Sequence, residues 1–204
     1  MDDDLNSVKT PYHHGALRPA LIAAAGALIA ERGIDRFSLR ETARRAGVSP
    51  SAPAHHFGDA RGLLTAIAAE AFNDFGDALA AADAAAGPER KARIRAQGLA
   101  YVAFALANRA RFDLMWRGAL LDKSDPAYAE AGDRAFRILD AAARGGKASG
   151  AGADDIDLAP SIAAWSIVHG FARLAIDGAF GVGEGVAERA TDHLLPAVLG
   201  HLKV

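Results

Sequence analysis

Cysteine is absent from the sequence, which excludes disulfides, thiolate metal ligands and a cysteine nucleophile. Long apolar runs are also missing, because charges interrupt the Ala-rich windows within about 18 residues, fewer than a membrane span needs. The acidic start MDDDLNSVK has no apolar stretch either, so we expect no signal peptide. These absences favour a soluble cytoplasmic protein.

Strand patterns are missing too, because no stretch of alternating Val, Ile or Thr occurs. Aromatic residues make up only 7% of the chain, so a core must consist largely of Ala, Leu, Ile and Val. Alanine is the strongest helix former and recurs in runs such as AIAAEAF and ALAAADAAA. We therefore predict an all-α protein of about nine helices.

Charge is distributed unevenly, although the formal net charge is only −2. Residues 13–61 carry seven arginines and four acids, whereas residues 62–204 carry fifteen bases and eighteen acids. A basic segment ahead of an acidic one suggests a module that faces a polyanion. An imbalance this small is equally compatible with chance.

The first helices can be placed from their end signals. An apolar stripe runs from Gly15 to Arg32, and Gly33 ends it. Ser38 and Glu41 have the spacing of a capping box, so a second helix should begin at Leu39 and stop at Gly47.

The stretch AGVSPSAPAHHFGD, residues 46–59, predicts a turn followed by a short third helix. Ser49 is a suitable N-cap, which places Pro50 at the first helical position and Pro53 at the fourth. Asp59 can cap a fourth helix that ends near Gly87. Further helices are expected at residues 89–108, 109–121, 126–144, 158–177 and 186–201, the last with a kink at Pro196.

Two short helices joined by a glycine turn and preceded by a longer one describe a helix-turn-helix. Val48 would fill the space between the two short helices, and the second would present its first residues to a DNA major groove. Exposed arginines on the first could neutralise phosphates. A helix-turn-helix that binds no DNA is the alternative that the pattern leaves open.

Residues 15–75 resemble the DNA-binding domain of the TetR family of bacterial transcriptional regulators. The match runs through ERGIDRFSLRETARRAGVS, then HHF, then GLLTAI, in the family's order. The resemblance implies an all-helical homodimer whose N-terminal domains bind a palindromic operator. Residues 76–204 would then form a C-terminal regulatory and dimerisation domain that senses a ligand. Its final two helices should form a four-helix bundle with those of the second copy, and the apolar surface for it should come from Leu174, Ile176, Leu194, Leu195, Val198 and Leu202.

The resemblance also implies which residues contact DNA. Arg40 matches a position that commonly does so, whereas Ala54 and Ala60 stand where members often have Tyr and Lys. Arg61 can replace that Lys as a phosphate contact. The expected DNA-binding residues are Ser38, Arg40, Arg44, Ser49, Ser51, Ala52, His55, His56 and Arg61.

A second resemblance covers AAWSIVHGFARLAIDG, residues 163–178, which looks like a Trp-x-x-x-His-Gly segment of one C-terminal domain type in this family. Trp165 and His169 are four residues apart and share a helix face. They either lie beside an effector cavity or form a buried Trp packed on a hydrogen-bonded His. A second aromatic concentration, which includes Phe112, either fills voids or lines the same cavity. The candidate ligand-binding residues are Tyr101, Phe104, Met115, Trp116, Trp165 and His169.

Other classes of function find less support. Serine-hydrolase, phosphate-loop and His-Glu metal motifs are missing, so we expect no enzyme and no cofactor. Adjacent histidines on a helix diverge by about 100°, so His55 and His56 form a poor metal pair. We expect a repressor that binds double-stranded DNA and responds to a small apolar effector. The alternative is a constitutive DNA-binding or interaction dimer with a filled core.

Overall fold

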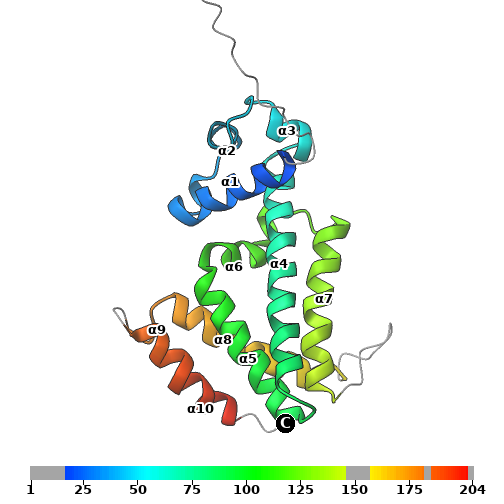
Figure 1. The fold of residues 1–204 in the computed structure, drawn as a ribbon, viewed down its shortest axis with the longest axis vertical. Coiled ribbons are helices and arrows are strands. Elements are labelled where there is room, and N and C mark those ends of the chain that lie inside the picture. Colours follow the sequence, from blue (N-terminus) through cyan, green and yellow to red (C-terminus); the bar gives the residue numbers. More distant parts are fainter. Residues whose placement is uncertain (1–16, 146–156, 182–184, 202–204) are drawn as a thin grey trace, which may run out of the picture.

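The computed structural model of the protein describes residues 17–145, 157–181 and 185–201. Every regular element in these ranges is helical, which confirms the predicted all-α class. A small group of helices, α1 to α3, lies at one end of the molecule, and the long helix α4 joins it to a larger group (Figure 1). The predictions for the N-terminal segment 1–9 and for Leu202 lie outside the described residues.

The N-terminal group consists of short elements around one apolar cluster. Leu63, Ile67 and Ala68 of α4 pack there against Ile22 and Ile29 of α1, and all five side chains are buried. Leu114 and Leu121 of the larger group complete the cluster, so the two groups share this core. The elements are α1 (Leu17–Arg32), the 3-10 turn η1 (Ile34–Arg36), α2 (Leu39–Arg45), α3 (Ala52–Phe57) and α4 (Ala60–Ala85).

The third helix starts later than its sequence signals predict. Ser51, not Ser49, stands at the N-cap, and Pro53 occupies the second helical position instead of the fourth. The Ala52 N–H donates to the Ser49 carbonyl over 3.0 Å. This bond joins residues three apart, so the turn that it closes is one residue shorter than a turn of α-helix. The first helical bond runs from His55 to Ser51, so Pro53 costs the helix no hydrogen bond.

Helix α4 begins and ends where the sequence predicts. The Asp59 side chain accepts a hydrogen bond from the Gly62 N–H over 2.9 Å, and Gly87 follows the helix with a φ of 77°. The expected domain boundary at residues 75 and 76 falls within α4, which continues unbroken there. One helix thus serves both groups, and the division into two domains stays a prediction.

The larger group is formed by the remaining helices around the lower half of α4 (Figure 1). The predicted helix 109–121 is shorter in the structure, because Arg117 leaves the helical conformation with a ψ of 63°. The elements are α5 (Arg90–Ala107), α6 (Arg109–Trp116), the 3-10 turn η2 (Gly118–Leu120), α7 (Pro126–Ala143), α8 (Ala159–Ile176), α9 (Val186–Arg189), the π segment η3 (Ala190–Leu194) and α10 (Leu195–Gly200).

The last helix changes its hydrogen-bonding pattern next to Pro196. Residues Ala190–Leu194 form a π-helical segment between α9 and α10, and Pro196 is the second residue of α10. Because proline has no N–H, the regular ladder cannot continue through it, and the wider π turn takes up the mismatch. Counting α9, η3 and α10 as one irregular helix, the described residues contain nine helices, as predicted.

Candidate nucleic-acid interface and effector cavity

The turn between α2 and α3 is closed by two backbone hydrogen bonds after the end of α2. The Gly47 N–H donates to the Arg44 carbonyl over 3.3 Å, and the Val48 N–H donates to the Ala43 carbonyl over 3.0 Å. This pair of bonds is a Schellman motif, which needs a left-handed residue, and Gly47 supplies it with a φ of 69°. The glycine thus fixes the direction in which the chain enters α3.

Most of the predicted DNA-binding residues of α2 and α3 lie on the surface. Arg40 and Arg44 of α2 are exposed, as are Ser38, Ser49 and Ser51. His55 and His56 are exposed at the other end of α3, whereas Ala52 is half-buried. A depression lined by Arg40, Arg44 and Pro50, among others, lies between α2 and the turn that follows it.

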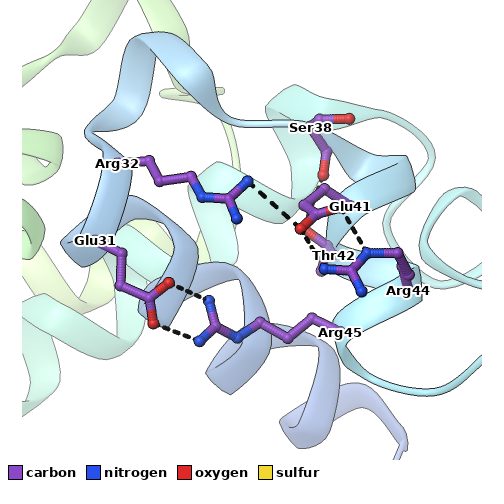
Figure 2. Close-up of polar contacts among 7 residues, drawn as sticks. All are labelled: Glu31, Arg32, Ser38, Glu41, Thr42, Arg44 and Arg45. Atoms are coloured by element: carbon purple, nitrogen blue, oxygen red, sulfur yellow. Dashed lines mark hydrogen bonds and ion pairs between the residues drawn. The ribbon is translucent and has the colours of Figure 1, made fainter.

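The capping box predicted at the start of α2 does not form. Ser38 has the extended backbone of an N-cap, but its side chain makes no capping hydrogen bond. Glu41 instead accepts two hydrogen bonds from Arg44, of 2.8 and 2.7 Å, and Arg32 lies 3.5 Å from it (Figure 2). A bidentate contact between opposite charges is stronger than the single hydrogen bond that Glu41 could accept from the uncharged Ser38 N–H.

Two ion pairs tie α1 to α2. Figure 2 shows Arg32 directed towards Glu41, and Arg45 forming a bidentate pair with Glu31. Hydrogen bonds from Arg44 are the main cause that lowers the pKa of Glu41 to about 2, and Arg45 likewise lowers the pKa of Glu31. Among the described residues Arg40 has no ion-pair partner, so its guanidinium can meet a phosphate or base without breaking a pair.

Arg61 lies elsewhere. Its guanidinium contacts the Ala119 carbonyl in η2 over 3.4 Å. Hydrogen bonds from Ser124 are the main cause that lowers the pKa of Asp122, and the charge of Arg61 adds to them. Among the described residues no contact joins Arg61 to Arg40 or Arg44. Its expected phosphate contact stays a prediction, and the structure places the side chain against the larger group of helices.

A cavity of about 250 Å³ lies between α4, α5, α6, α7 and α8. Its walls are mostly apolar, and both tryptophans of the chain belong to them. Phe72 and Phe75 contribute from α4, and Phe136 contributes from α7. Small residues of α7, such as Gly132 and Ala135, leave the space that the rings surround.

The predicted ligand-binding residues divide into two sets. Tyr101, Trp116 and Trp165 line the cavity. Phe104 and Met115 are buried core residues that do not line it, because Phe104 packs on Phe75 with ring centroids 5.2 Å apart and Met115 is fully enclosed. His169 also lies outside the lining, and it contacts two lining residues, Tyr101 through a hydrogen bond and Trp116 ring to ring.

A polar network connects two helices, α5 and α8, behind the cavity wall. The Trp165 indole N–H donates to the Tyr101 hydroxyl oxygen over 3.2 Å, and that hydroxyl lies 2.9 Å from His169 Nδ1. Burial raises the pKa of Tyr101, so its proton stays on the hydroxyl. Burial, together with the charge of Arg173, lowers the pKa of His169 and favours its neutral form. Both alternatives for the Trp-His pair therefore hold in part: Trp165 lines the cavity, and His169 is a hydrogen-bonded partner behind it.

Sequence reasoning missed the cavity residues of α4 and α7. Phe72, Phe75 and Phe136 fall on helices that were expected only as core, and Gly132 carried no turn signal. Spacing along one helix gives no information about which neighbour faces it. The one available signal was the spacing of four between Gly132 and Phe136, which places a small and a large residue on one face of α7.

An apolar surface lies on the last helices. Ile162 and Leu174 of α8 are 42% and 51% exposed, and Leu194 before α10 is 40% exposed. Ile176 and Val198 are half-buried. Leu195, expected to add to the apolar surface, is instead fully buried within the chain, because it packs into the core of the larger group.

Two other features, a metal site and a membrane-spanning helix, are not found among the described residues. No group of three or more His, Cys, Asp or Glu side chains in these ranges could hold a metal ion. Within the same ranges, no helix combines the length and the hydropathy that crossing a membrane requires.

Comparison with protein families gives two matches. Residues 21–67 match the family described as bacterial regulatory proteins, tetR family, and residues 94–198 match the one described as Tetracyclin repressor-like, C-terminal domain. The second match spans more than half of the chain. This match does not confirm the predicted Trp-His-Gly type of C-terminal domain, which stays a prediction. A search of curated proteins finds no match.

Solved structures share the fold over nearly the whole chain. A protein of unknown function from Rhodococcus sp. RHA1 is 34% identical, with a TM-score of 0.74 over 94% of this chain and 98% of the other. The TetR family transcriptional regulator PfmR from Thermus thermophilus is 24% identical, with a TM-score of 0.61 over 90% and 99%. The multidrug binding protein EbrR, solved with imidazole, is 19% identical, with a TM-score of 0.57 over 89% and 88%. The chain belongs to the TetR family of DNA-binding transcriptional regulators, which are generally not enzymes.

Proposed function

We propose that the protein is a ligand-responsive transcriptional repressor that acts in the cytoplasm and binds a palindromic operator as a homodimer. The observation that carries the DNA-binding part is the exposed face of α2 and α3. Arg40, Ser49 and Ser51 are presented there beside a turn that the Gly47 backbone fixes. A second helix held at such a turn can place its first residues against base edges in the major groove.

The dimer is supported by the apolar surface of α8 and the last helix. The exposed leucine and isoleucine side chains of α8 and the last helix would be covered by a contact between proteins. A two-fold dimer also fits the target, because two copies of one reading helix match the two halves of a palindrome.

The proposed homodimer has its own test. Leu174→Glu places a charge on the most exposed of these side chains and should turn a dimer into a monomer in analytical ultracentrifugation at micromolar concentration. Ala129→Glu, at an exposed position of α7, is the matched control and should leave the dimer intact. A wild-type protein that sediments only as a monomer would contradict the homodimer.

The ligand response is supported by the aromatic cavity. A core filled by side chains would make the protein a constitutive DNA-binding or interaction dimer, and a space of about 250 Å³ leaves that alternative open. This volume lies just below the ~300 Å³ at which drug-sized sites begin, which favours a smaller effector. A ligand can release DNA only if it prefers the conformer of the dimer in which the two copies of α3 are wrongly spaced for successive major grooves.

Ion pairs offer a connection between the cavity and the DNA-binding group. Arg117, next to the cavity residue Trp116, lies 3.3 Å from Asp35 of η1 and 2.9 Å from Asp113. Asp113 in turn lies 3.1 Å from Arg173 of α8, one helical turn beyond His169. A shift of α6 or α8 around a ligand would therefore change contacts that end on the segment before α2.

The experiment for the DNA-binding part is a selection of genomic fragments by the full chain at physiological salt. Bound fragments should share an inverted repeat, and the wild-type protein should prefer them over scrambled fragments of equal length. Fragments without a common sequence would contradict the operator. Loss of repression from a reporter on adding small aromatic compounds, with DNA selection intact, would support the ligand response separately.

A further inference from the structure

The helix proposed to read DNA is too short to fix its own orientation. Helix α3 has six residues, whereas an isolated helix of fewer than about 12 residues is marginal in water. Its direction must therefore come from the side chains that attach it to the rest of the N-terminal group. Pro53 is buried near its start, and Phe57 is half-buried at its end, where it packs against the apolar cluster of that group. Phe57 thus attaches the C-terminal end of α3.

Arg18, the second residue of α1, lies over the ring of Phe57. Its guanidinium carbon is 5.2 Å from the ring centroid, within the ~6 Å at which a cation is attracted to the face of an aromatic ring. The start of α1 lies beside α3 (Figure 1), so this contact joins the first turn of α1 to the last turn of α3. In the part of the chain that the structure describes, no hydrogen bond or ion pair holds this guanidinium elsewhere.

An acid of α4 attracts the same guanidinium. Burial raises the pKa of the Glu70 carboxyl, and the charges of Arg111 and Arg18 act against that rise. Arg111 is already paired with Asp74 over 2.7 Å, whereas Arg18 has no such partner among the described residues. Arg18 is therefore attracted towards α4, the helix that follows α3, in addition to its contact with the ring.

We propose that Arg18 is a positioning residue for α3: its guanidinium lies over Phe57 and holds the C-terminal end of the helix in one orientation. A helix that is already held loses less conformational freedom when it binds, so the free energy of operator binding is more favourable. Arg18 acts through Phe57 and makes no contact with a phosphate. This inference rests on the proposed reading of an operator by α3, but the attachment itself can be measured without DNA.

Amide hydrogen exchange of the free protein measures the attachment. The His55 and Gly58 N–H groups donate to the Ser51 and Ala54 carbonyls, so their exchange reports opening of α3. In Arg18→Ala both should exchange about two- to fivefold faster, which corresponds to one exposed contact between a cation and a ring. Amides of α4 should keep their wild-type rates. Arg137→Ala, at an exposed position of α7, is the matched control and should leave α3 unchanged.

Operator binding separates a positioning residue from a phosphate contact. With a fragment obtained by genomic selection, Arg18→Ala should lower the affinity about two- to fivefold for each copy of α3 that binds, and so about four- to 25-fold for a dimer. The slope of log affinity against log salt concentration should stay at the wild-type value. Loss of a phosphate contact would instead reduce the magnitude of that slope by about 0.9. Fluorescence anisotropy at several salt concentrations gives both quantities.

A double-mutant cycle shows whether Arg18 acts through the ring. Phe57→Leu keeps an apolar side chain at the end of α3 and removes the ring that attracts the cation. In the Phe57→Leu background, Arg18→Ala should change operator affinity by less than about twofold. Arg137→Ala has no contact with Phe57 and should have the same small effect in both backgrounds. Circular dichroism melting of each variant excludes unfolding as the cause of any loss.

Three results would overturn the proposal. These are unchanged exchange at the end of α3 in Arg18→Ala, a salt slope reduced by about 0.9 or more, or an equally large loss of affinity from Arg18→Ala with and without Phe57→Leu. A protein that selects no DNA sequence but still shows faster exchange of α3 in Arg18→Ala would refute the proposed operator and leave the attachment standing.

Discussion

Polar groups beside the start of α4 and polar groups beyond its midpoint lie in opposite settings. Near its start, the charges of α1 and α2 lie at the surface, where Glu41 holds Arg44 and Arg40 is exposed. Beyond its midpoint, Tyr101 and Trp116 place their polar atoms among buried rings. Surface charges can be exchanged at little cost in stability, whereas buried polar groups are coupled to the packing around them. Binding of DNA and stability of the fold should therefore respond to different substitutions.

The largest expected effect tests the cavity end. Phe112 is fully buried and edge-on to Tyr101 at 5.8 Å and to Trp116 at 6.1 Å between centroids. Phe112→Ala should lower the free energy of unfolding by about 3–5 kcal/mol, because it removes a ring and leaves a cavity. Arg40→Ala should change it by about 0.5 kcal/mol or less. Urea unfolding measures both, and similar values for the two variants would break the comparison.

The next effect tests the DNA-binding end. If Arg40 reads a guanine, Arg40→Ala should cost about 1–3 kcal/mol of operator binding and relax specificity at that base pair. Arg44→Ala should cost less, because Arg44 must first leave Glu41 before it can neutralise a phosphate. Fluorescence anisotropy with labelled operator measures the ranking, with the exposed Arg137→Ala on α7 as the control. A larger loss from Arg44→Ala would show that the pair with Glu41 does not restrain it.

A third effect concerns the connection between the ends. Arg117→Ala removes the ion pairs to Asp35 and Asp113, so a ligand should affect operator affinity by about 0.5–2 kcal/mol less. Affinity for the ligand alone and for DNA alone should remain close to the wild-type values. Measuring operator affinity with and without ligand gives the coupling directly. Unchanged coupling would mean that the signal travels through packing alone.

The smallest effect is a dependence of stability on pH. The pKa of His169 is lowered in the folded protein, so the folded state binds a proton there less readily than the unfolded state. The contribution of His169 is therefore fully present above the unfolded pKa of about 6.5 and is lost as the pH falls from there through the lowered folded pKa. Melting temperatures between pH 8 and pH 5 should fall less steeply for His169→Gln than for the wild-type protein.

Sequence patterns predicted the N-terminal group more fully than the cavity, because its signals are local. Gly47 ends α2 and Asp59 caps α4 as expected, since each depends on a few neighbouring residues. The capping box at Ser38 failed because Arg32 and Arg44, from outside the four-residue pattern, take the Glu41 carboxylate. Local signals lose to stronger partners that the fold brings near.

The cavity shows the other limit of such patterns. Tyr101, Trp116 and Trp165 were expected beside it, but their neighbours from α4 and α7 could not be paired with them from spacing alone. Helical periodicity gives the face that a residue occupies and does not give the helix that this face meets. Met115 and Phe104 have the same residue chemistry as the lining, and only the packing of five helices separates the two sets.

The affinity ratio between a selected genomic fragment and its scrambled counterpart tests the central claim most directly. Measured at physiological salt for the wild-type protein and for Arg40→Ala, it separates base reading from phosphate attraction. We predict a wild-type ratio of about 1,000 or more and a clearly smaller ratio for Arg40→Ala. A wild-type ratio near one would contradict the assignment of the α2–α3 face as a reader of DNA sequence.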